Sequence, residues 1–368
     1  FFFQAEDGIR DQPRSLGSEM CIRDSVGTGL LKHLKKLIGQ AGATDQQFVV
    51  SSPHEWRLHG SAVKKSLPKT EHLLIPDGER SKTVQSVSRI YEALIRTMAD
   101  RSVTIIAVGG GVIGDVVGFA AATYLRGVQL VHVPTTLLAQ VDSSIGGKVG
   151  VNHPLGKNLI GSFHQPIAVV SDPDVLNTLP RREFRSGLYE IIKYGMIADQ
   201  ELFDRVRTNL SGIFNRSPEA IEPIITTSCQ IKAAVVEKDE QEHGLRRILN
   251  FGHTAGHAIE AATNYRRFRH GEAIAYGMLA VANIATKRGM LSENDRTSLT
   301  EVIENLGPLP SVRDLSAKKL LEIMKRDKKV SKGHLHVVLP TGIGTTEIVS
   351  DVTTREWQRA LKLIGVGL

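Results

Sequence analysis

Apolar and polar positions follow two different patterns along this chain, and the change comes near residue 180. Before that point, short apolar and β-branched runs alternate with helical segments such as the amphipathic stretch 84–98. The runs predicted to be strands span residues 48–51, 72–76, 103–108, 130–134 and 167–171. Strands that alternate with helices predict a doubly wound, mostly parallel sheet, and such sheets bind ligands at the carboxyl ends of their strands.

After residue 180 the strand signal nearly vanishes, apart from one late run over residues 335–339. Helical periods are predicted over residues 183–198, 218–237, 247–263, 271–287, 297–305 and 317–325. The chain is therefore predicted to hold an N-terminal α/β domain over residues 26–178 and an α-helical C-terminal domain over residues 179–368.

Residues 1–25 differ from the rest of the chain because they show neither a helical nor a strand period. The stretch from Gln4 to Asp11 is also what a common sequencing adaptor encodes in frame. We therefore expect residues 1–25 to be a non-native, disordered tail that packs against nothing, and we exclude it from the fold.

Composition narrows the class of protein. The apolar fraction of 41% suits a soluble globular enzyme, and no segment approaches the roughly 20 apolar residues of a membrane span. The two cysteines, Cys21 and Cys229, provide neither a disulfide framework nor a cysteine metal site, which fits the cytoplasm. The net charge of +7 comes from dispersed cations without neighbouring aromatic residues, which favours small anionic ligands over nucleic acid or membrane.

A glycine-rich turn follows the predicted strand 103–108. The run Gly109-Gly110-Gly111-Val112-Ile113-Gly114-Asp115 is typical of a strand that turns sharply into a helix. Glycines let the backbone approach a pyrophosphate, and the N–H groups of the helix start face the anion. The run therefore favours a dinucleotide site.

Three helical segments of the second domain carry candidate metal ligands. Glu190 precedes Lys193 by three residues, so the two share a helix face. His253 and His257 stand four residues apart, and His270 opens the next helix. A glutamate with two histidines is a ligand set of catalytic zinc. Thr254 stands where a zinc protease of the His-Glu-x-x-His type needs its glutamate, which argues against that class.

Two glycines lie close to these histidines. Gly252 and Gly256 would each cost about 1 kcal/mol relative to alanine inside a helix. We expect the close approach of a substrate or metal ion to compensate for that cost.

The first domain supplies a second group of polar residues. Thr135 and Thr136 follow the strand 130–134, and Asp142, Ser143 and Lys148 belong to the glycine-rich stretch 142–148. A further Lys157-Asn158 pair follows in the turn 156–161. The spacing of a Walker phosphate loop is absent.

Together these blocks resemble the 3-dehydroquinate synthase family of sugar phosphate cyclases, from about residue 27 to the end. The blocks that carry the resemblance span residues 109–115, 134–148, 156–161, 190–195, 245–260 and 270–277. The related metal-dependent alcohol and glycerol dehydrogenases match less well, because they usually lack the block around Lys148.

The resemblance implies an NAD-binding α/β domain, a helical metal-binding domain and an active site in the cleft between them. It implies one zinc or cobalt ion held by Glu190, His253 and His270. The NAD contacts that it implies are Asp77, Gly78, Glu79, Lys82, Gly110, Gly111, Val112, Ile113, Gly114, Asp115, Thr135, Thr136, Lys148, Lys157, Val175, Leu176, Asn177 and Thr178.

The substrate implied by the resemblance is a seven-carbon sugar acid phosphate. The catalytic and substrate contacts that it implies are Arg126, Asp142, Lys148, Asn158, Lys193, Lys232, Arg246, Asn250 and His257, with one of Lys328 and Lys329. So many cations in one site would repel one another without an anionic ligand. The implied reaction oxidises a hydroxyl with NAD, eliminates phosphate, returns the hydride and closes the ring by an intramolecular aldol step. The family also implies a homodimer.

Two features depart from the family pattern. The family's first strand should precede residue 27, where the adaptor-like tail stands, and Ser51-Ser52-Pro53 replaces the acidic or amide residue expected to bind the adenosine ribose. Asp77 or Glu79 would compensate, so the choice of NAD over NADP rests on the family. Three alternatives remain: another sugar phosphate cyclase, a metal- and NAD-dependent polyol dehydrogenase, and a catalytically inactive binding protein.

Overall fold

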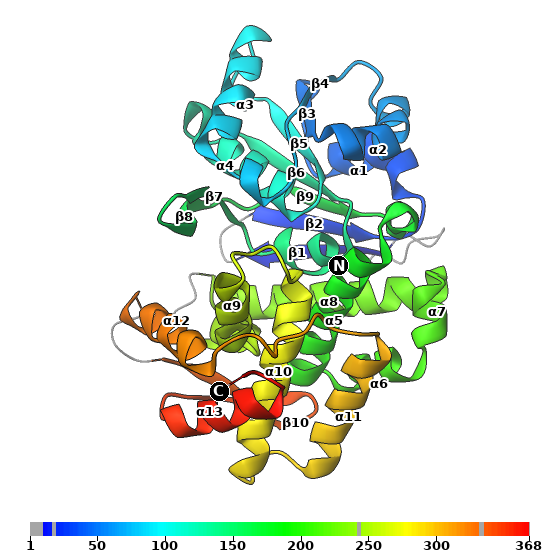
Figure 1. Cartoon of the computed structure of the whole chain (residues 1–368). Coiled ribbons are helices and arrows are strands. Elements are labelled where there is room, and N and C mark those ends of the chain that lie inside the picture. Colours follow the sequence, from blue (N-terminus) through cyan, green and yellow to red (C-terminus); the bar gives the residue numbers. More distant parts are fainter. Residues whose placement is uncertain (1–9, 17–19, 241–243, 331–334, 368) are drawn as a thin grey trace. The chain divides into compact units, whose positions relative to one another are not determined.

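The computed structural model describes residues 10–16, 20–240, 244–330 and 335–367, with side-chain surroundings for residues 24–240, 244–325 and 335–367. The chain divides into two compact units (Figure 1). The first unit runs to Pro180 and also takes in Arg216–Ala233, and the second comprises Arg181–Asn215 and the residues from Ala234 onward. The division near residue 180 lies close to the predicted boundary, but the return of Arg216–Ala233 to the first unit was not foreseen.

A seven-stranded sheet forms the centre of the first unit, with strand order β1-β2-β9-β6-β5-β3-β4. Its strands are β1 (Arg10–Leu16), β2 (Met20–Val26), β3 (Gln47–Ser51), β4 (Glu71–Leu74), β5 (Thr104–Gly109), β6 (Gln129–Pro134) and β9 (Ala168–Ser171). Every neighbouring pair is parallel except β1 with β2. The predicted α/β fold with a mostly parallel sheet is therefore confirmed.

Helices flank this sheet. They are α1 (Leu34–Gln40), α2 (Pro53–Ser66), α3 (Val84–Arg96) and α4 (Gly111–Thr123). The first part of α8 (Pro218–Lys238) belongs to the same unit. Phe48 pairs with Ile105 across β3 and β5, and both side chains join the buried stripe of α3 and α4 in one core. Because side chains alternate along a strand, every second residue of each run faces these two helices. The other face of the sheet contacts α1 and α2.

The N-terminal segment is the clearest departure from the sequence prediction. Residues Arg10–Leu16 and Met20–Val26 form an antiparallel hairpin, and Arg23–Val26 pair in parallel with Ala168–Ser171 of β9. Strand pairing uses backbone N–H and C=O groups, so a segment without apolar periodicity still fills the free edge of β9. Residues 23–25, which were expected to belong to a disordered tail, thus occupy the place of the missing first strand.

A hairpin that the periodicity did not predict also belongs to the first unit. Strands β7 (Lys148–His153) and β8 (Gly156–Phe163) pair antiparallel, with Gly150 opposite Gly161. The close approach of the two strands needs these glycines, since an added Cβ on Gly150 would lie 2.6 Å from the carbonyl oxygen of Ile160. The hairpin carries Lys148, Lys157 and Asn158.

The second unit is helical, as predicted, with one small hairpin. Its elements are α5 (Arg181–Ala198), α6 (Gln200–Thr208), α7 (Leu210–Phe214), the end of α8, η6 (Leu245–Asn250), α9 (His253–Ala262), α10 (His270–Lys287), α11 (Glu293–Asn305), α12 (Ala317–Val330), β10 (Val337–Gly342), β11 (Thr345–Val349) and α13 (Thr354–Leu363). The helix predicted over residues 247–263 is broken, because Gly252 has a φ of +77° and caps a new helix at His253. Within the described residues, no helix is long and apolar enough to cross a membrane.

Candidate active site and metal centre

The predicted NAD contacts of the first unit gather where its parallel strands end. Residues 77–82 follow β4, the glycine run follows β5, and Thr135 and Thr136 follow β6. Residues 175–178 lie in the short 3₁₀ helix η5 (Pro173–Thr178) after β9. Since the carboxyl ends of parallel strands share one edge of a sheet, these four loops form the ligand-binding edge expected of this fold.

The backbone at the start of α4 is closely packed, which requires glycine. Gly110 caps the helix, and an added Cβ on Gly111 would lie 2.8 Å from the Oγ of Ser143. The side chains of Ile113, Val175 and Leu176 are buried in the protein interior. These three residues therefore offer a ligand only their backbone groups, as an anion site at a helix start requires.

Polar side chains from the segment after β4, from α4 and from the β7–β8 hairpin form a cluster beside this edge. The Lys82 ammonium contacts both the Asp115 carboxylate and the side-chain carbonyl of Asn158. Lys157 lies 3.1 Å from the Glu79 carboxylate, which also accepts a 2.7 Å hydrogen bond from Asn152. The structure therefore brings together four predicted NAD contacts and one predicted substrate contact. The NAD contacts are Glu79, Lys82, Asp115 and Lys157, and the substrate contact is Asn158.

Asn152 was missed from the sequence. It also accepts a 3.0 Å hydrogen bond from the backbone of Asn158, whose φ of +54° lies in the left-handed region. An asparagine two positions before a proline-containing turn carries no signal that distinguishes this role from an ordinary loop residue.

The cluster shifts the ionisation of its carboxylates in opposite directions. Burial raises the pKa of Asp115 to about 6, although the Lys82 ammonium opposes the change. Burial would also raise the pKa of Glu79, but the Asn152 hydrogen bond and the charges of Lys157 and Lys82 lower it below its ordinary value. Both pKa values lie below 7, so the carboxylates are mostly ionised at neutral pH and balance the cations that surround them.

The remaining candidates of the first unit are divided between two places. Lys232 of α8 donates to Asp142, at 2.7 Å to the backbone carbonyl and 2.6 Å to the carboxylate. Lys148 is exposed at the start of β7. Arg126 lies in the turn before β6, at the amino end of that strand, whereas Thr135 follows its carboxyl end. A strand rises about 3.3 Å per residue, so the whole length of β6 separates Arg126 from that edge.

The metal-ligand candidates converge in the second unit. Glu190 on α5, His253 at the start of α9 and His270 at the start of α10 each place a ligand atom within 4.8 Å of the other two. The Glu190 carboxylate is fully buried and lies 3.6 Å from the Nε2 of His270. Ligands about 2.0–2.2 Å from one zinc ion would lie roughly 3.3 Å apart, so one carboxylate and two imidazoles fit such an ion.

A buried lysine stands beside these ligands. Lys193, one helical turn beyond Glu190 and 1% exposed, pairs with the Glu190 carboxylate. From the sequence alone, such a pair is expected to be an ordinary ion pair on the protein surface, whereas here both groups are removed from water. Burial of a charge is costly unless it is paired.

The two histidines differ in their protonation. Burial, followed by the nearby Lys193 charge, holds the pKa of His253 well below its usual value. Burial also opposes a charge on His270, but hydrogen bonds to Glu190 and Glu260 raise the pKa of His270 to about 10. Metal ligation requires a neutral imidazole, so an ion bound by His270 would displace a proton from this ring.

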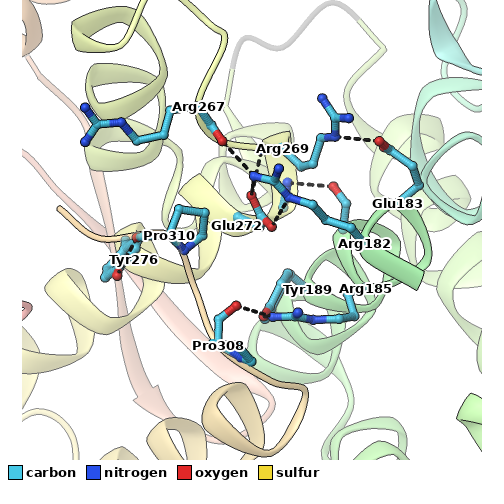
Figure 2. A network of polar contacts seen from close by, with 12 residues as sticks. Arg182, Glu183, Arg185, Tyr189, Arg267, Arg269, Glu272, Tyr276, Pro308 and Pro310 are labelled. Atoms are coloured by element: carbon cyan, nitrogen blue, oxygen red, sulfur yellow. Dashed lines mark hydrogen bonds and ion pairs between the residues drawn. The ribbon is translucent and has the colours of Figure 1, made fainter. Parts of the chain in front are cut away.

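A polar network fixes the start of α10, where His270 lies (Figure 2). The buried Glu272 carboxylate accepts two hydrogen bonds of 2.7 Å from the Arg182 guanidinium on α5 and one of 2.8 Å from the backbone of Arg269. Arg182 also donates to the carbonyl of Arg267, and Arg269 pairs with Glu183. The helix start is thus joined to the helix that carries Glu190, which sets the two ligands at a fixed spacing.

The glycines near the ligands have a different role from the one expected. An added Cβ on Gly252 would lie 2.9 Å from the carbonyl oxygen of Ile274, and one on Gly256 would lie 2.7 Å from the Ile274 side chain. From the other helix, a Cβ on Gly277 would lie 1.8 Å from the carbonyl oxygen of Gly252. The packing of α10 against α9, and not the approach of a substrate or metal, accounts for these glycines.

The last candidates surround α9. Arg246 is buried and donates to the backbone carbonyl of Glu240, while Asn250 and His257 are exposed. The His257 ring centroid lies 5.1 Å from that of His253 and 5.9 Å from that of His270. The side chains of Lys328 and Lys329 lie outside the described residues.

Known protein families and individual relatives match this chain along almost its whole length. The family model for the N-terminal part of 3-dehydroquinate synthase matches residues 72–186, and that for its C-terminal part matches residues 187–330. A relative from Nostoc punctiforme named 3-dehydroquinate synthase is 49% identical over 83% of this chain and 86% of its own length. A relative of the same name from Crocosphaera subtropica is 48% identical over 98% of this chain and 97% of its own.

Solved structures of related enzymes share the fold. A 2-epi-5-epi-valiolone synthase from Streptomyces hygroscopicus, solved with NAD⁺ and Zn²⁺ bound, is 30% identical with a TM-score of 0.86, over 95% of this chain and 98% of that one. A 2-deoxy-scyllo-inosose synthase complexed with carbaglucose-6-phosphate, NAD⁺ and Co²⁺ is 27% identical with a TM-score of 0.84, over 97% of this chain and 100% of that one. From its two matching family models and its full-length relatives, the chain belongs to the 3-dehydroquinate synthase family.

Proposed function

We propose that this chain converts 3-deoxy-D-arabino-heptulosonate 7-phosphate into 3-dehydroquinate and phosphate, with NAD and one zinc or cobalt ion as cofactors. The observation that carries the proposal is the group formed by the buried Glu190 with the half-buried His253 and His270, beside Lys193, in a chain of this family. Two relatives solved with NAD⁺ and Zn²⁺ or Co²⁺ support the choice of cofactors.

The first unit would bind NAD at the carboxyl edge of its sheet. Backbone N–H groups at the start of α4 would face the pyrophosphate, as helix starts do in dinucleotide folds. Lys82 and Lys157 would add positive charge, and their present partners Asp115 and Glu79 hold them in place.

The second unit would hold the metal ion through Glu190, His253 and His270, leaving a further coordination position for the substrate. When bound, the ion would lower the pKa of the substrate hydroxyl, and NAD would take up a hydride and later return it. Lys193 would remain next to the Glu190 carboxylate and supply a positive charge toward an anionic substrate.

The cationic residues account for an acid phosphate as the substrate. Lys193, Lys232 and Arg246 are buried, and each contacts an oxygen of this chain. Buried cations are stable only with such partners, and a substrate carboxylate and phosphate would offer additional ones. In the elimination, phosphate leaves with the bonding electron pair, so cations around it stabilise the charge that develops.

The test follows the redox balance. Purified protein with the seven-carbon acid phosphate, a divalent metal ion and less than one equivalent of NAD should release one phosphate per product over many turnovers. NADH absorbance should stay flat during this time, because the hydride returns to the intermediate. NADH that rises in step with product would identify a polyol dehydrogenase, and release of no phosphate would exclude the proposed reaction.

A second sugar phosphate cyclase activity is the nearest competing function. The two relatives with the high TM-scores are named for different cyclisation products, so the fold alone admits several substrates. Assays with a panel of sugar phosphates would separate them, and we expect the seven-carbon acid to be turned over fastest. Faster turnover of a sugar phosphate without a carboxylate would contradict the assignment.

We further propose a small anionic sugar acid phosphate as the only class of partner besides a second copy of the chain, and a cytoplasmic location. The homodimer rests on the family resemblance. Sedimentation of the purified protein would test it, and a monomer at micromolar concentration would contradict it.

A further inference from the structure

We infer that Glu260 is a positioning residue that orients the metal ligand His270 through its Nδ1 atom. The inference rests on the proposed metal centre and concerns a residue that the sequence did not single out. Glu260 lies on α9, seven residues after His253, and its side chain is 9% exposed.

The His270 ring lies between two carboxylates. Its Nδ1 is 3.4 Å from Oε2 of Glu260, and its Nε2 is 3.6 Å from Oε1 of Glu190. A neutral imidazole carries a proton on one nitrogen and a lone pair on the other, so a carboxylate at one side selects the nitrogen that donates. In the neutral, metal-binding form of the ring, an Nδ1–H directed at Glu260 would leave the lone pair of Nε2 for an ion at the proposed metal centre beside Glu190.

His253 has the same arrangement. Its Nδ1 lies 3.1 Å from the backbone carbonyl of Phe251, an acceptor that leaves its Nε2 for a metal ion. Both histidines would therefore bind through Nε2 while an oxygen acceptor holds Nδ1. Acceptors of this kind fix the ring orientation and raise the basicity of the ligating nitrogen.

The burial of Glu260 makes this contact effective. A carboxylate in a nearly dry position interacts more strongly with a neighbouring N–H group than an exposed carboxylate does. Because Glu260 lies on α9, it also links the two proposed histidine ligands: α9 begins at His253, and its Glu260 orients the ring of His270 on α10. A change at Glu260 should therefore act on ion binding without removing a ligand.

One competing arrangement uses the same residues. Ligand atoms of His257, Glu260 and His270 also lie within 4.8 Å of one another, so Glu260 and His257 could themselves bind an ion through the Nδ1 side of His270. The first arrangement is favoured because Glu190 is fully buried, whereas His257 is exposed. The two arrangements predict different effects of His257→Ala.

The experiment measures ion affinity directly, by competition between apoprotein and a chelator for Zn²⁺ and Co²⁺. Glu260→Ala should weaken ion binding about 10–100-fold, the usual effect of losing a residue that orients a ligand. Glu260→Gln should recover much of the affinity, because its amide oxygen still accepts the Nδ1–H hydrogen bond. His257→Ala should bind the ion as tightly as the unaltered protein.

A matched control is available at the other end of α10. Glu356 accepts bonds of 2.6 and 3.0 Å from Arg288, which caps that helix. Glu356→Gln should lower the unfolding temperature while leaving ion affinity unchanged. It thereby separates a loss of stability from a loss of ligand orientation.

Each other outcome overturns a distinct statement. Equal loss of affinity in Glu260→Gln, Glu260→Ala and His257→Ala would make Glu260 and His257 ligands and reject the positioning role. Unchanged affinity in Glu260→Ala, with affinity lost in His270→Ala, would reject the role of Glu260 alone. Full affinity in His270→Ala would reject the proposed metal centre itself.

Discussion

Single buried charges dominate the candidate site at the scale of residues. Glu190 and Lys193 are both removed from water and stabilise each other, so neither can be changed without exposing the other to an unfavourable environment. The Glu190 carboxylate belongs to two such relations, since it also faces His270. Because this carboxylate is shared, we expect the proposed metal site and the protein's stability to depend on one another.

Lys193→Met should destabilise the metal-free protein by about 3 kcal/mol, because a buried carboxylate loses its cation. Added Zn²⁺ should restore part of this loss, since the ion supplies positive charge to Glu190. Thermal unfolding with and without Zn²⁺ measures both effects. Arg205→Met is the control: the Arg205–Glu201 pair is exposed, and its loss should cost at most about 0.5 kcal/mol. Equal effects of the two variants would show that the burial of Lys193 has no energetic consequence.

His270→Ala should lose most of its bound metal, because only Glu190 and His253 remain as ligands. Elemental analysis of the purified variant gives the metal content per chain. His257→Ala, which removes an exposed neighbour of the same rings, should keep one ion per chain. Full metal content in His270→Ala would contradict the ligand assignment.

At the scale of elements, the crossing of α9 and α10 determines where the ligands meet. Three glycines at close contacts, Gly252, Gly256 and Gly277, allow it. A fourth, Gly271, brings α10 against α5, because an added Cβ there would lie 2.0 Å from the carbonyl oxygen of Ser186. Both ligand histidines are first residues of these helices, so any shift of the crossing would move both rings.

Gly277→Ala should lower the unfolding temperature by many degrees, because its Cβ would meet the backbone of Gly252 at 1.8 Å. Overpacking typically costs about 1–3 kcal/mol, and backbone cannot move aside as a side chain can. Gly39→Ala in α1, where an added Cβ meets nothing within 4 Å, should leave stability unchanged or raise it by up to about 1 kcal/mol. Similar unfolding temperatures for the two variants would contradict the close crossing.

The contact between α10 and α13 gives a pH dependence. Hydrogen bonds from Arg288 lower the pKa of Glu356 from 4.5 to about 2. A lowered folded-state pKa gives stability that is present above the unfolded-state pKa and is lost as pH falls through the folded-state pKa. Glu356→Gln should therefore cost about 1–3 kcal/mol at pH 7, and less as pH falls from 4.5 toward 2. Urea unfolding of both proteins at pH 7 and pH 3.5 measures this difference, and a cost that grows at low pH would contradict it.

The apolar pattern predicted the elements that bury apolar side chains, and it failed where backbone geometry decides. The strands that carry Phe48, Ile105 and Val131 were predictable because each is a short run whose residues are nearly all buried. The stripe of α3 was predictable because its buried apolar residues have helical spacing. The β7–β8 hairpin and the break at Gly252 were not, since they depend on close backbone approach and a positive φ.

The candidate site was predictable to a similar degree. Ligand type and helical spacing made Glu190, His253, His257 and His270 candidates in the sequence, and the family resemblance selected Glu190, His253 and His270 among them. The contacts of Asn152 and Glu260 depend on which loops and helices meet, so no local pattern reports them. Arg126 matched the family motif, yet the sequence could not show that it lies at the amino end of β6.

At the scale of the whole molecule, the first unit depends on two segments that the sequence analysis placed elsewhere. Residues 23–26 complete one side of β9, and Arg216–Ala233 return to this unit after a segment of the other. Thr28 illustrates the dependence on Arg216–Ala233, because its backbone N–H donates a hydrogen bond of 2.7 Å to the carboxylate of Glu222.

Deleting residues 1–25 should lower the unfolding temperature, because Asp24 and Ser25 are buried and their backbone pairs with β9. This expectation replaces the one drawn from the sequence, in which the segment packs against nothing. Deleting residues 1–22 is the matched control, since it keeps the four residues that pair with β9. If both deletions left the unfolding temperature of the full chain unchanged, the pairing of residues 23–25 with β9 would not stabilise the fold, and this expectation would be wrong.

The return of Arg216–Ala233 also sets an order of events during synthesis. A ribosome makes the chain from its N-terminus, so the first unit cannot be completed until Ala233 has emerged, after the whole of Arg181–Asn215. Until then, the first unit lacks the α8 segment that holds Glu222 and Lys232, and its nascent form has to wait incomplete. For the same reason, no single cut in the chain releases either unit as one continuous piece.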